Sequence, residues 1–311
     1  MSGPWHAGEI ALQTAVGVAT RMAEVGPRVL RDHLIDQHRD FYPQLPFVVL
    51  GSVDPVGAVW ATLRAGHPGF AKAPDAHRLH VALPPETDDP AEAGLSDGAA
   101  VALLGIELPS RRRNRLNGRL TRTSDGFDIA VGQSYGNCPK YIQMRSPVFI
   151  RNPSVPAAYP PEILSSLDPA ARTQIAHADM VFVASYADTD SGRQVDVSHR
   201  GGAPGFIRVA ADGVLTIPDF AGNFFFNTLG NFALNPKAGL VFPDFATGDL
   251  LQMSGEVELD LTPAIGYAAA LRTWRFRARR IIRRRDALPL RADLAEWSPN
   301  ALAAGAWPEP T

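Results

Sequence analysis

The sequence predicts a mainly β protein of the α+β class, made of two small antiparallel β-barrels in tandem with flanking helices. Short runs of β-branched and aromatic residues alternate with turns rich in Gly, Pro, Asn and Asp, which is typical of small barrels. The pattern of the first half recurs in the second half. Pro-rich connections separate the halves from each other and from a helical beginning.

Three pairs of segments, in the same order along the chain, define the repeat. They are residues 47–50 with 182–185, 66–70 with 202–206, and 116–120 with 253–257. The offset between the copies grows by a single residue from each pair to the next, as expected for two diverged copies of one domain. The alternative is a coincidence of common Gly and Pro turns.

Composition limits the class of protein. The 311 residues suffice for two domains that each bury a core, and 45% hydrophobic with 20% charged residues indicates a soluble globular protein. A net charge of −2 gives no reason to expect nucleic acid or an anionic membrane as partner. The single cysteine, Cys138, excludes an intrachain disulfide. Without a membrane span or signal peptide in the sequence, we expect a cytoplasmic protein.

Residues 1–46 form a predicted helical lead-in that Gly26-Pro27 interrupts. His33 and His38 do not have the i, i+4 spacing of a helical metal site, so we expect no metal there. The first barrel spans residues 47–150. Its predicted strands are residues 47–53, 58–64, 78–83, 99–106, 115–123 and 127–132, with a surface loop or short helix at 84–97.

Two polar stretches of the first barrel are candidate ligand contacts. Residues 111–115 are Arg-rich, which fits either the solvated start of a strand or a phosphate contact. Residues 133–142 are dense in donors, including Gln133, Ser134 and Lys140. Cys138 lies close to Lys140, which would lower a thiol pKa, but no neighbouring His could act as base, so we favour a buried structural thiol.

A linker with a helix at 161–178 occupies residues 151–179, and the second barrel spans residues 180–290. Asn223 is a predicted N-cap for a helix over 224–234, on which Asn227, Thr228 and Asn231 share one side. A helix that starts just after a strand offers free N–H groups to an anion. The alternative is an ordinary polar helix face.

The rest of the second barrel and the tail complete the predicted order. Strands are expected at 180–185, 195–200, 206–209, 214–217, 238–243, 249–259 and 274–279, with a short helix at 262–271. The Arg-rich end of the closing strand is interpreted as a solvated or interface face, because the chain as a whole is not basic. The tail, residues 291–311, carries Trp297 and Trp307 and is expected to pack loosely or across a partner.

The second half resembles the FMN-binding split barrel of the pyridoxamine 5′-phosphate oxidase-like superfamily. The resemblance rests on residues 201–209, on the turn ending in Asn235-Pro236, and on the strand at 238–242. Residues 133–134 and 137–142 are similar to segments of flavin-binding members, and residues 5–9 with Gln13 are similar to the lead-in of the two-barrel branch. Together these segments cover about residues 5–290.

The resemblance implies two tandem FMN-binding split barrels with FMN between them. It implies contacts from the second barrel through Arg208, Asn227, Thr228 and Asn231, contacts from the first through Gln133, Ser134 and Lys140, and His199 and Arg200 near the flavin ring. The family's vitamin oxidases carry basic residues where this chain has Asn227-Thr228-Leu229, a departure that bears both on phosphate affinity and on pyridoxamine phosphate as substrate.

The expected function is therefore an FMN-dependent oxidoreductase acting on a small organic substrate or electron acceptor. A non-catalytic flavin, deazaflavin or haem carrier, or a barrel used for protein contacts, is the alternative. A homodimer is possible in either case.

Overall fold

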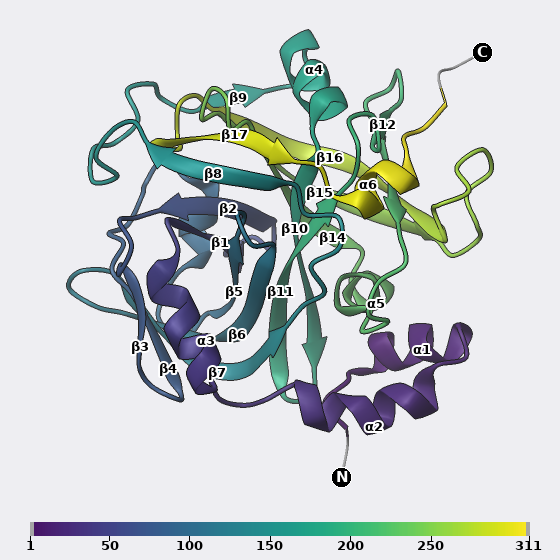
Figure 1. Ribbon diagram of the computed structural model, residues 1–311, viewed down its shortest axis with the longest axis horizontal. Coiled ribbons are helices and arrows are strands. Elements are labelled where there is room, and N and C mark those ends of the chain that lie inside the picture. The colour runs from purple at the N-terminus through teal and green to yellow at the C-terminus, as the bar shows by residue number, and fades with distance from the viewer. Residues whose placement is uncertain (1–2, 309–311) are drawn as a thin grey trace.

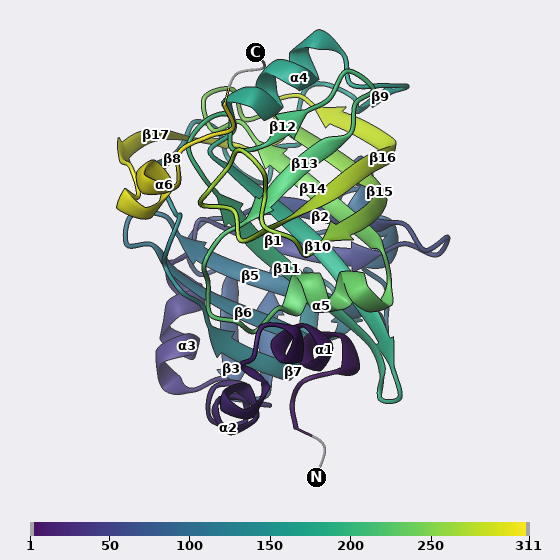
Figure 2. The same cartoon turned by 90° about the vertical axis from the view of Figure 1, so that its right-hand side faces the viewer.

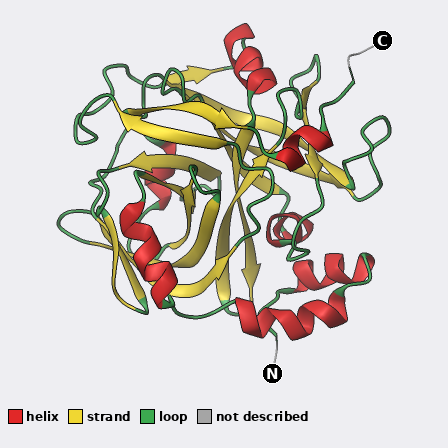
Figure 3. Cartoon of the chain, viewed as in Figure 1, coloured by secondary structure: helices red, strands yellow, loops and turns green. Residues whose placement is uncertain are grey.

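The computed structural model describes residues 3–308, so residues 1–2 of the predicted lead-in and 309–311 of the predicted tail lie outside it. The chain is mainly β (Figure 1). A seven-stranded and an eight-stranded sheet, both antiparallel, are accompanied by a two-stranded sheet. Helices lie at the periphery of the strands (Figure 3). None of the described helices is long and apolar enough to cross a membrane.

The first sheet has the strand order β2-β1-β5-β6-β7-β4-β3. Its strands are β1 (Phe47–Val53), β2 (Val59–Ala65), β3 (Ala71–Asp75), β4 (Arg78–Val81), β5 (Ala100–Glu107), β6 (Arg112–Arg122) and β7 (Phe127–Gly136). The six strands predicted for this half are present. Strand β3 was not predicted because it is largely exposed and contains Pro74, so it lacks the apolar alternation of the others.

The second sheet has the strand order β11-β10-β14-β15-β16-β13-β12. Its strands are β10 (Met180–Thr189), β11 (Gly192–Gly201), β12 (Arg208–Val209), β13 (Leu215–Asp219), β14 (Lys237–Pro243), β15 (Leu250–Asp260) and β16 (Arg272–Arg284), and β9 (Glu162–Leu164) pairs with β16. Each strand predicted for this half is found, although β12 is shorter than expected.

The two sheets have the same order of strands. Each strand of the first sheet has a counterpart in the second at the same place, from β2 and β11 at one edge to β3 and β12 at the other. The ladder between β6 and β7 is interrupted by a β-bulge at Asn117/Gly118. The ladder between β15 and β16 is interrupted at Ser254/Gly255, which are the residues that the sequence repeat pairs with them. A shared bulge is a specific feature, because bulges fix the register of a strand pair.

The bulges also correct one detail of the sequence repeat. Counting from them along the paired strands, Leu104 of β5 corresponds to Val241 of β14. Leu104 pairs with Val49, and Val241 pairs with Phe182. Phe182 therefore corresponds to Val49 and not to Phe47. The sequence match slipped because the β10–β11 ladder extends further before its turn than the β1–β2 ladder does.

Three apolar clusters hold the sheets together. One lies inside each half, and the third lies between the halves and draws on β1, β2, β5, β10 and β11. Phe47 and Phe182 are fully buried in this shared cluster. The sheets pack closely at Gly51, where an added Cβ would make a tight contact of 3.2 Å with the Cβ of Ala184. The shared core brings strand ends from both halves together.

The helices differ in detail from the prediction. They are α1 (Ala7–Ala15), α2 (Ala19–Val29), α3 (Asp36–Phe41), α4 (Pro169–His177), α5 (Asn227–Leu234) and α6 (Pro299–Ala304), with short 3-10 helices η1 (Tyr42–Gln44) and η2 (Pro90–Gly94). Pro27 lies in the last turn of α2 rather than breaking it. Helix α4 begins late because Asp168 caps it, accepting a hydrogen bond from the Ala171 N–H. The helix predicted at 262–271 is wrong; turns replace it, with Gly266 at a positive φ.

The C-terminal segment is tied to the first half of the chain. Strand β17 (Leu290–Glu296) pairs with β8 (Met144–Phe149). Trp307 stacks near Tyr267, with ring centroids 5.0 Å apart, and under the guanidinium of Arg208 at 4.4 Å. Up to residue 308 the tail therefore packs on its own chain rather than loosely.

Candidate functional site

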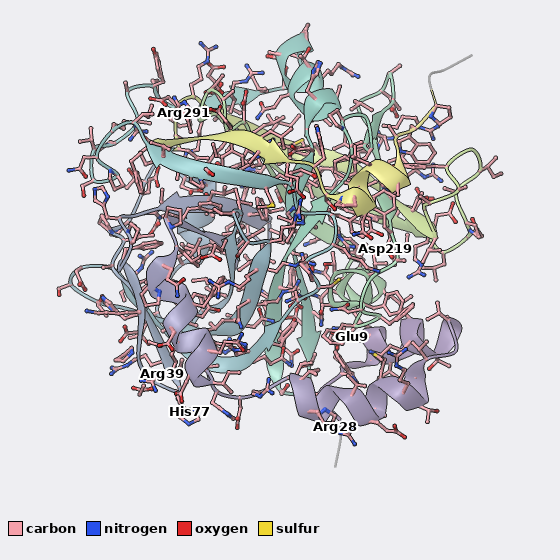
Figure 4. All side chains as sticks on the ribbon, viewed as in Figure 1. Glu9, Arg28, Arg39, His77, Asp219 and Arg291 are labelled. Atoms are coloured by element: carbon pink, nitrogen blue, oxygen red, sulfur yellow. The ribbon has the colours of Figure 1, made fainter. Side chains whose placement is uncertain are left out.

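A cleft lies where the two halves meet, between β11, β13 and the start of α5 on one side and β6 with residues 137–141 on the other. Its cavity volume is about 110 Å³, and it opens to solvent at its mouth. Asp219, at the end of β13, marks it in Figure 4. Because both walls come from one chain, no second copy is needed to form it.

The start of α5 shapes one wall of the cleft. The predicted N-cap Asn223 instead closes a turn, its Oδ1 accepting from the Phe225 N–H at 3.2 Å, and the helix begins at Asn227. Phe224 and Phe226 adopt left-handed backbone conformations, with φ of 64° and 63°, which is unusual for bulky residues and marks a constrained site. Both rings line the cleft. No side chain caps α5, so its first turn offers N–H groups to an anion.

Cationic groups dominate the lining. They are Arg113, Arg115, Lys140, Arg200 and Arg272. Asp219 forms ion pairs with Arg200 at 2.6 Å and with Arg272 at 3.2 Å. Arg113 forms no ion pair within residues 3–308; its Nε donates to the Cys138 carbonyl at 2.8 Å. Burial, and then repulsion by Arg115 and Arg200, lowers the pKa of Arg113 to about 9, so it stays charged at neutral pH. The cleft is thus suited to an anionic ligand.

Several buried donors in the lining lack a partner. Among the described residues these atoms are Nε of Arg115, Nδ2 of Asn137, Nε2 of His199 and Nε of Arg200. Burial, followed by repulsion from Arg113 and Arg200, lowers the pKa of His199 well below its usual value, so its ring is neutral at pH 7. Buried polar groups without partners are costly and uncommon in folded proteins. Four such atoms line this cleft, and a polar ligand bound there would give them partners.

A buried polar network supports the cleft from behind. Asp196 accepts hydrogen bonds from Arg115 at 3.2 Å, from Asn117 at 2.8 Å and from Asn231 at 3.0 Å. Arg115 also donates to Asn227 at 3.1 Å, and Asn227 donates to Glu9 of α1 at 2.5 Å. The network fixes Arg115 and Asn227 in the wall.

Helix α1 closes the network against solvent. It packs directly on α5 (Figure 2), which requires Gly8, because a Cβ there would stand 2.1 Å from the carbonyl oxygen of Gly230. Glu9 is 4% exposed and lies between the two helices. The lead-in thereby supports the wall of the cleft through Glu9 and Asn227, although no residue of the lead-in lines the cleft.

The structure brings some of the predicted site residues to the cleft and not others. Lys140, His199, Arg200, Asn227 and Thr228 line it. Asn231 lies behind it, in the network around Asp196. The Thr228 hydroxyl donates to Ser198 at 2.8 Å, within the wall.

The remaining predicted residues lie elsewhere. Gln133 faces Asn117 at 3.5 Å. Ser134 is fully buried near His38, 3.1 Å from its Nδ1. Arg208 stacks on Trp307, away from the cleft. Strand alternation explains Ser134, because a side chain of β7 that points into the first half cannot also face the second.

Arg113 and Arg115 were missed as individual site residues, although the Arg-rich run was noted. Residues two apart on a strand share a face, and here that face is a wall of the cleft. Arg111 does not continue the face, because it lies in the preceding turn with a φ of 60°. The spacing of Arg113 and Arg115, two residues apart at the start of a strand, was the sequence signal that could have placed both on the cleft wall.

Two solved structures show a distant similarity to part of this chain. No family model matches the sequence, and no match was found among curated proteins. A structure of HupZ from Group A Streptococcus is similar at 15% identity, covering 37% of this chain and 90% of that one, with a TM-score of 0.29. A putative pyridoxamine 5′-phosphate oxidase from Lactobacillus delbrueckii is similar at 16% identity, covering 34% and 95%, with a TM-score of 0.27.

Proposed function

We propose that the cleft binds FMN and that the protein is an oxidoreductase of the pyridoxamine 5′-phosphate oxidase-like type, with its two sheets serving as tandem split barrels. The observation that carries the proposal is the group of buried, unpartnered donors on the cleft wall among cationic side chains. A ligand with both a phosphate and a polar ring satisfies such a set better than a purely apolar one.

The residues present fit this cofactor. Arg113, Arg200 and Lys140 would hold a phosphate, because guanidinium and ammonium groups match its charge and its acceptors. Phe224 and Phe226 offer apolar ring faces. Bound FMN would supply the hydride or electron chemistry.

Side chains of the cleft would bind and orient the cofactor. Neutral His199 can donate or accept one hydrogen bond through Nε2 without bringing in a charge. Arg115, held by Asp196, adds a fixed positive charge to the wall, which favours an anionic form of a bound group. The small organic substrate or acceptor would enter through the open mouth.

The test is binding of FMN and riboflavin to the purified protein, followed by flavin fluorescence. Replacing Arg113 or Arg200 with Leu should weaken FMN binding about 10–100-fold, the usual effect of losing a hydrogen bond to a charged group. Riboflavin has no phosphate, so its binding should change little. Arg279→Leu on the exposed face of β16 is the control.

A visible spectrum of the purified protein, before and after FMN is added, decides between the proposal and its alternatives. A flavin band that grows with added FMN supports it. A Soret band would point to haem, and a colourless protein that takes up no FMN would refute the flavin assignment.

A further inference from the structure

The cleft has a structural counterpart on the other side of the molecule. Counting through the ladders from the two bulges, Thr62 and Arg64 of β2 hold the places that Ser198 and Arg200 hold in β11. Because the sheets share one topology, a second place exists where a strand of one half meets a strand of the other. We call it the counterpart site.

The other half contributes two further donors to the counterpart site. Gln252 of β15 holds the place of Arg115 in β6, and Arg284 at the end of β16 holds the place of Asn137 after β7. Both side chains are buried. The counterpart site thus keeps a set of convergent donors from both halves, as the cleft does.

A carboxylate of the chain itself occupies the centre of this donor set. Asp89, 2% exposed, accepts from the Thr62 hydroxyl at 2.5 Å and from Nε2 of Gln252 at 3.1 Å. Its Oδ2 lies 2.9 Å from Nη1 of Arg284. Three donors from two halves of the molecule therefore meet on one internal anion.

Two more carboxylates of the same segment complete the arrangement. Glu86 forms ion pairs with Arg64 at 2.8 Å and with Arg284. Glu92 lies 3.2 Å from Nη1 of Arg64. All three acidic residues belong to residues 84–94, the connection between β4 and β5. The equivalent connection in the second half carries α5 and leaves the cleft open.

The two places differ in how far their donors are satisfied. In the cleft, one buried nitrogen of each of four side chains has no partner among the described residues: Nε of Arg115, Nδ2 of Asn137, Nε2 of His199 and Nε of Arg200. Within residues 3–308, none of the counterpart donors on Thr62, Arg64, Gln252 and Arg284 is left buried without one. The cleft therefore has buried nitrogens without partners, whereas the counterpart site has none among the described residues.

We propose that residues 84–94 fill a second anion site with their own carboxylates, so that the chain binds a single phosphate-bearing ligand, and that removing these charges opens the counterpart site to phosphate. The identity of the ligand rests on the proposed function; the occupation of the counterpart site by an anion does not.

The experiment compares the wild type with the variant E86Q/D89N/E92Q. Calorimetric titration with FMN should give one site per chain for both proteins, because Gln and Asn keep the volume of the side chains that they replace and leave no room for a second FMN. In parallel, inorganic phosphate should raise the Tm of the variant by about 2–4 °C once its concentration exceeds the Kd tenfold. Chloride at the same ionic strength should not do so, and the wild type should gain less from phosphate.

The phosphate measurement and the FMN titration contradict different proposals when they fail. If both proteins bind one FMN and phosphate stabilises both equally, the inference is refuted while the proposed function stands. If the wild type binds no FMN, the proposed function fails, and the phosphate arm still decides on the counterpart site.

A single substitution covers the case in which the triple variant does not fold. Asp89→Asn keeps the shape of the side chain and removes the central charge, and Asp88→Asn, at an exposed neighbouring position, is its matched control. A phosphate-specific gain in Tm for Asp89→Asn over Asp88→Asn supports the inference, and equal gains overturn it.

Discussion

Glu9 provides the sharpest test of the buried network, because its carboxyl group should be neutral in the folded protein. Burial, and secondly the negative charge of Asp196, raises the pKa of Glu9 from 4.5 to about 8. Hydrogen bonds from the His6 N–H and from the Asn227 amide oppose this shift without cancelling it. The unfolded chain ionises this group near its ordinary value, so folding takes up a proton between these two pH values.

The direction in which Glu9 changes the stability of the fold with pH follows from its raised pKa. Since the pKa of Glu9 is raised on folding, its contribution to stability is fully present below pH 4.5 and is lost as the pH rises towards about 8. Each pH unit in that window costs about 1.4 kcal/mol, which amounts to roughly 5 kcal/mol over the whole window. Glu9→Gln removes the titration and keeps the size of the side chain.

We therefore expect the stability of Glu9→Gln relative to the wild type to increase by about 4 kcal/mol between pH 5 and pH 8. The measurement is urea denaturation followed by tryptophan fluorescence at pH 5, 6, 7 and 8, at constant ionic strength. Glu24→Gln on the exposed face of α2 is the control and should change stability by less than about 0.5 kcal/mol. A Glu9→Gln difference that stays constant over this pH range within about 1 kcal/mol would refute the reasoning.

Two further predictions concern the same region. Asp196→Asn should destabilise the protein by about 3–5 kcal/mol, because it leaves Arg115 buried without its carboxylate partner. The same substitution should lower the pKa of Glu9, because it removes a neighbouring negative charge. An unchanged pH dependence of unfolding would argue against the electrostatic coupling of Asp196 to Glu9. Gly8→Ala should separate α1 from α5, because the added methyl overlaps a main-chain oxygen. Limited proteolysis should then cut the lead-in faster, whereas Gly136→Ala, whose methyl meets nothing within 4 Å, should behave like the wild type.

The sequence by itself determined the strands and their grouping. Alternating apolar residues and turn chemistry are local properties, so the six strands predicted for the first half and the long closing strand β16 could be located from them. The Arg-rich run before residue 116 was noted as either a solvated strand start or a phosphate contact, and the sequence did not decide between them.

Only the tertiary structure decided the register between the halves, the backbone at the start of α5 and the partners of the buried polar side chains. The register between halves depends on ladder lengths and bulges, so the sequence match placed Phe182 two residues away from its structural counterpart. The left-handed Phe226 at the start of α5 follows from packing that no local propensity encodes. Above all, whether a polar side chain finds a partner depends on residues far away in the sequence, as Asp89 does on Gln252. For this reason only the folded chain distinguishes the open cleft from the site that its own carboxylates fill.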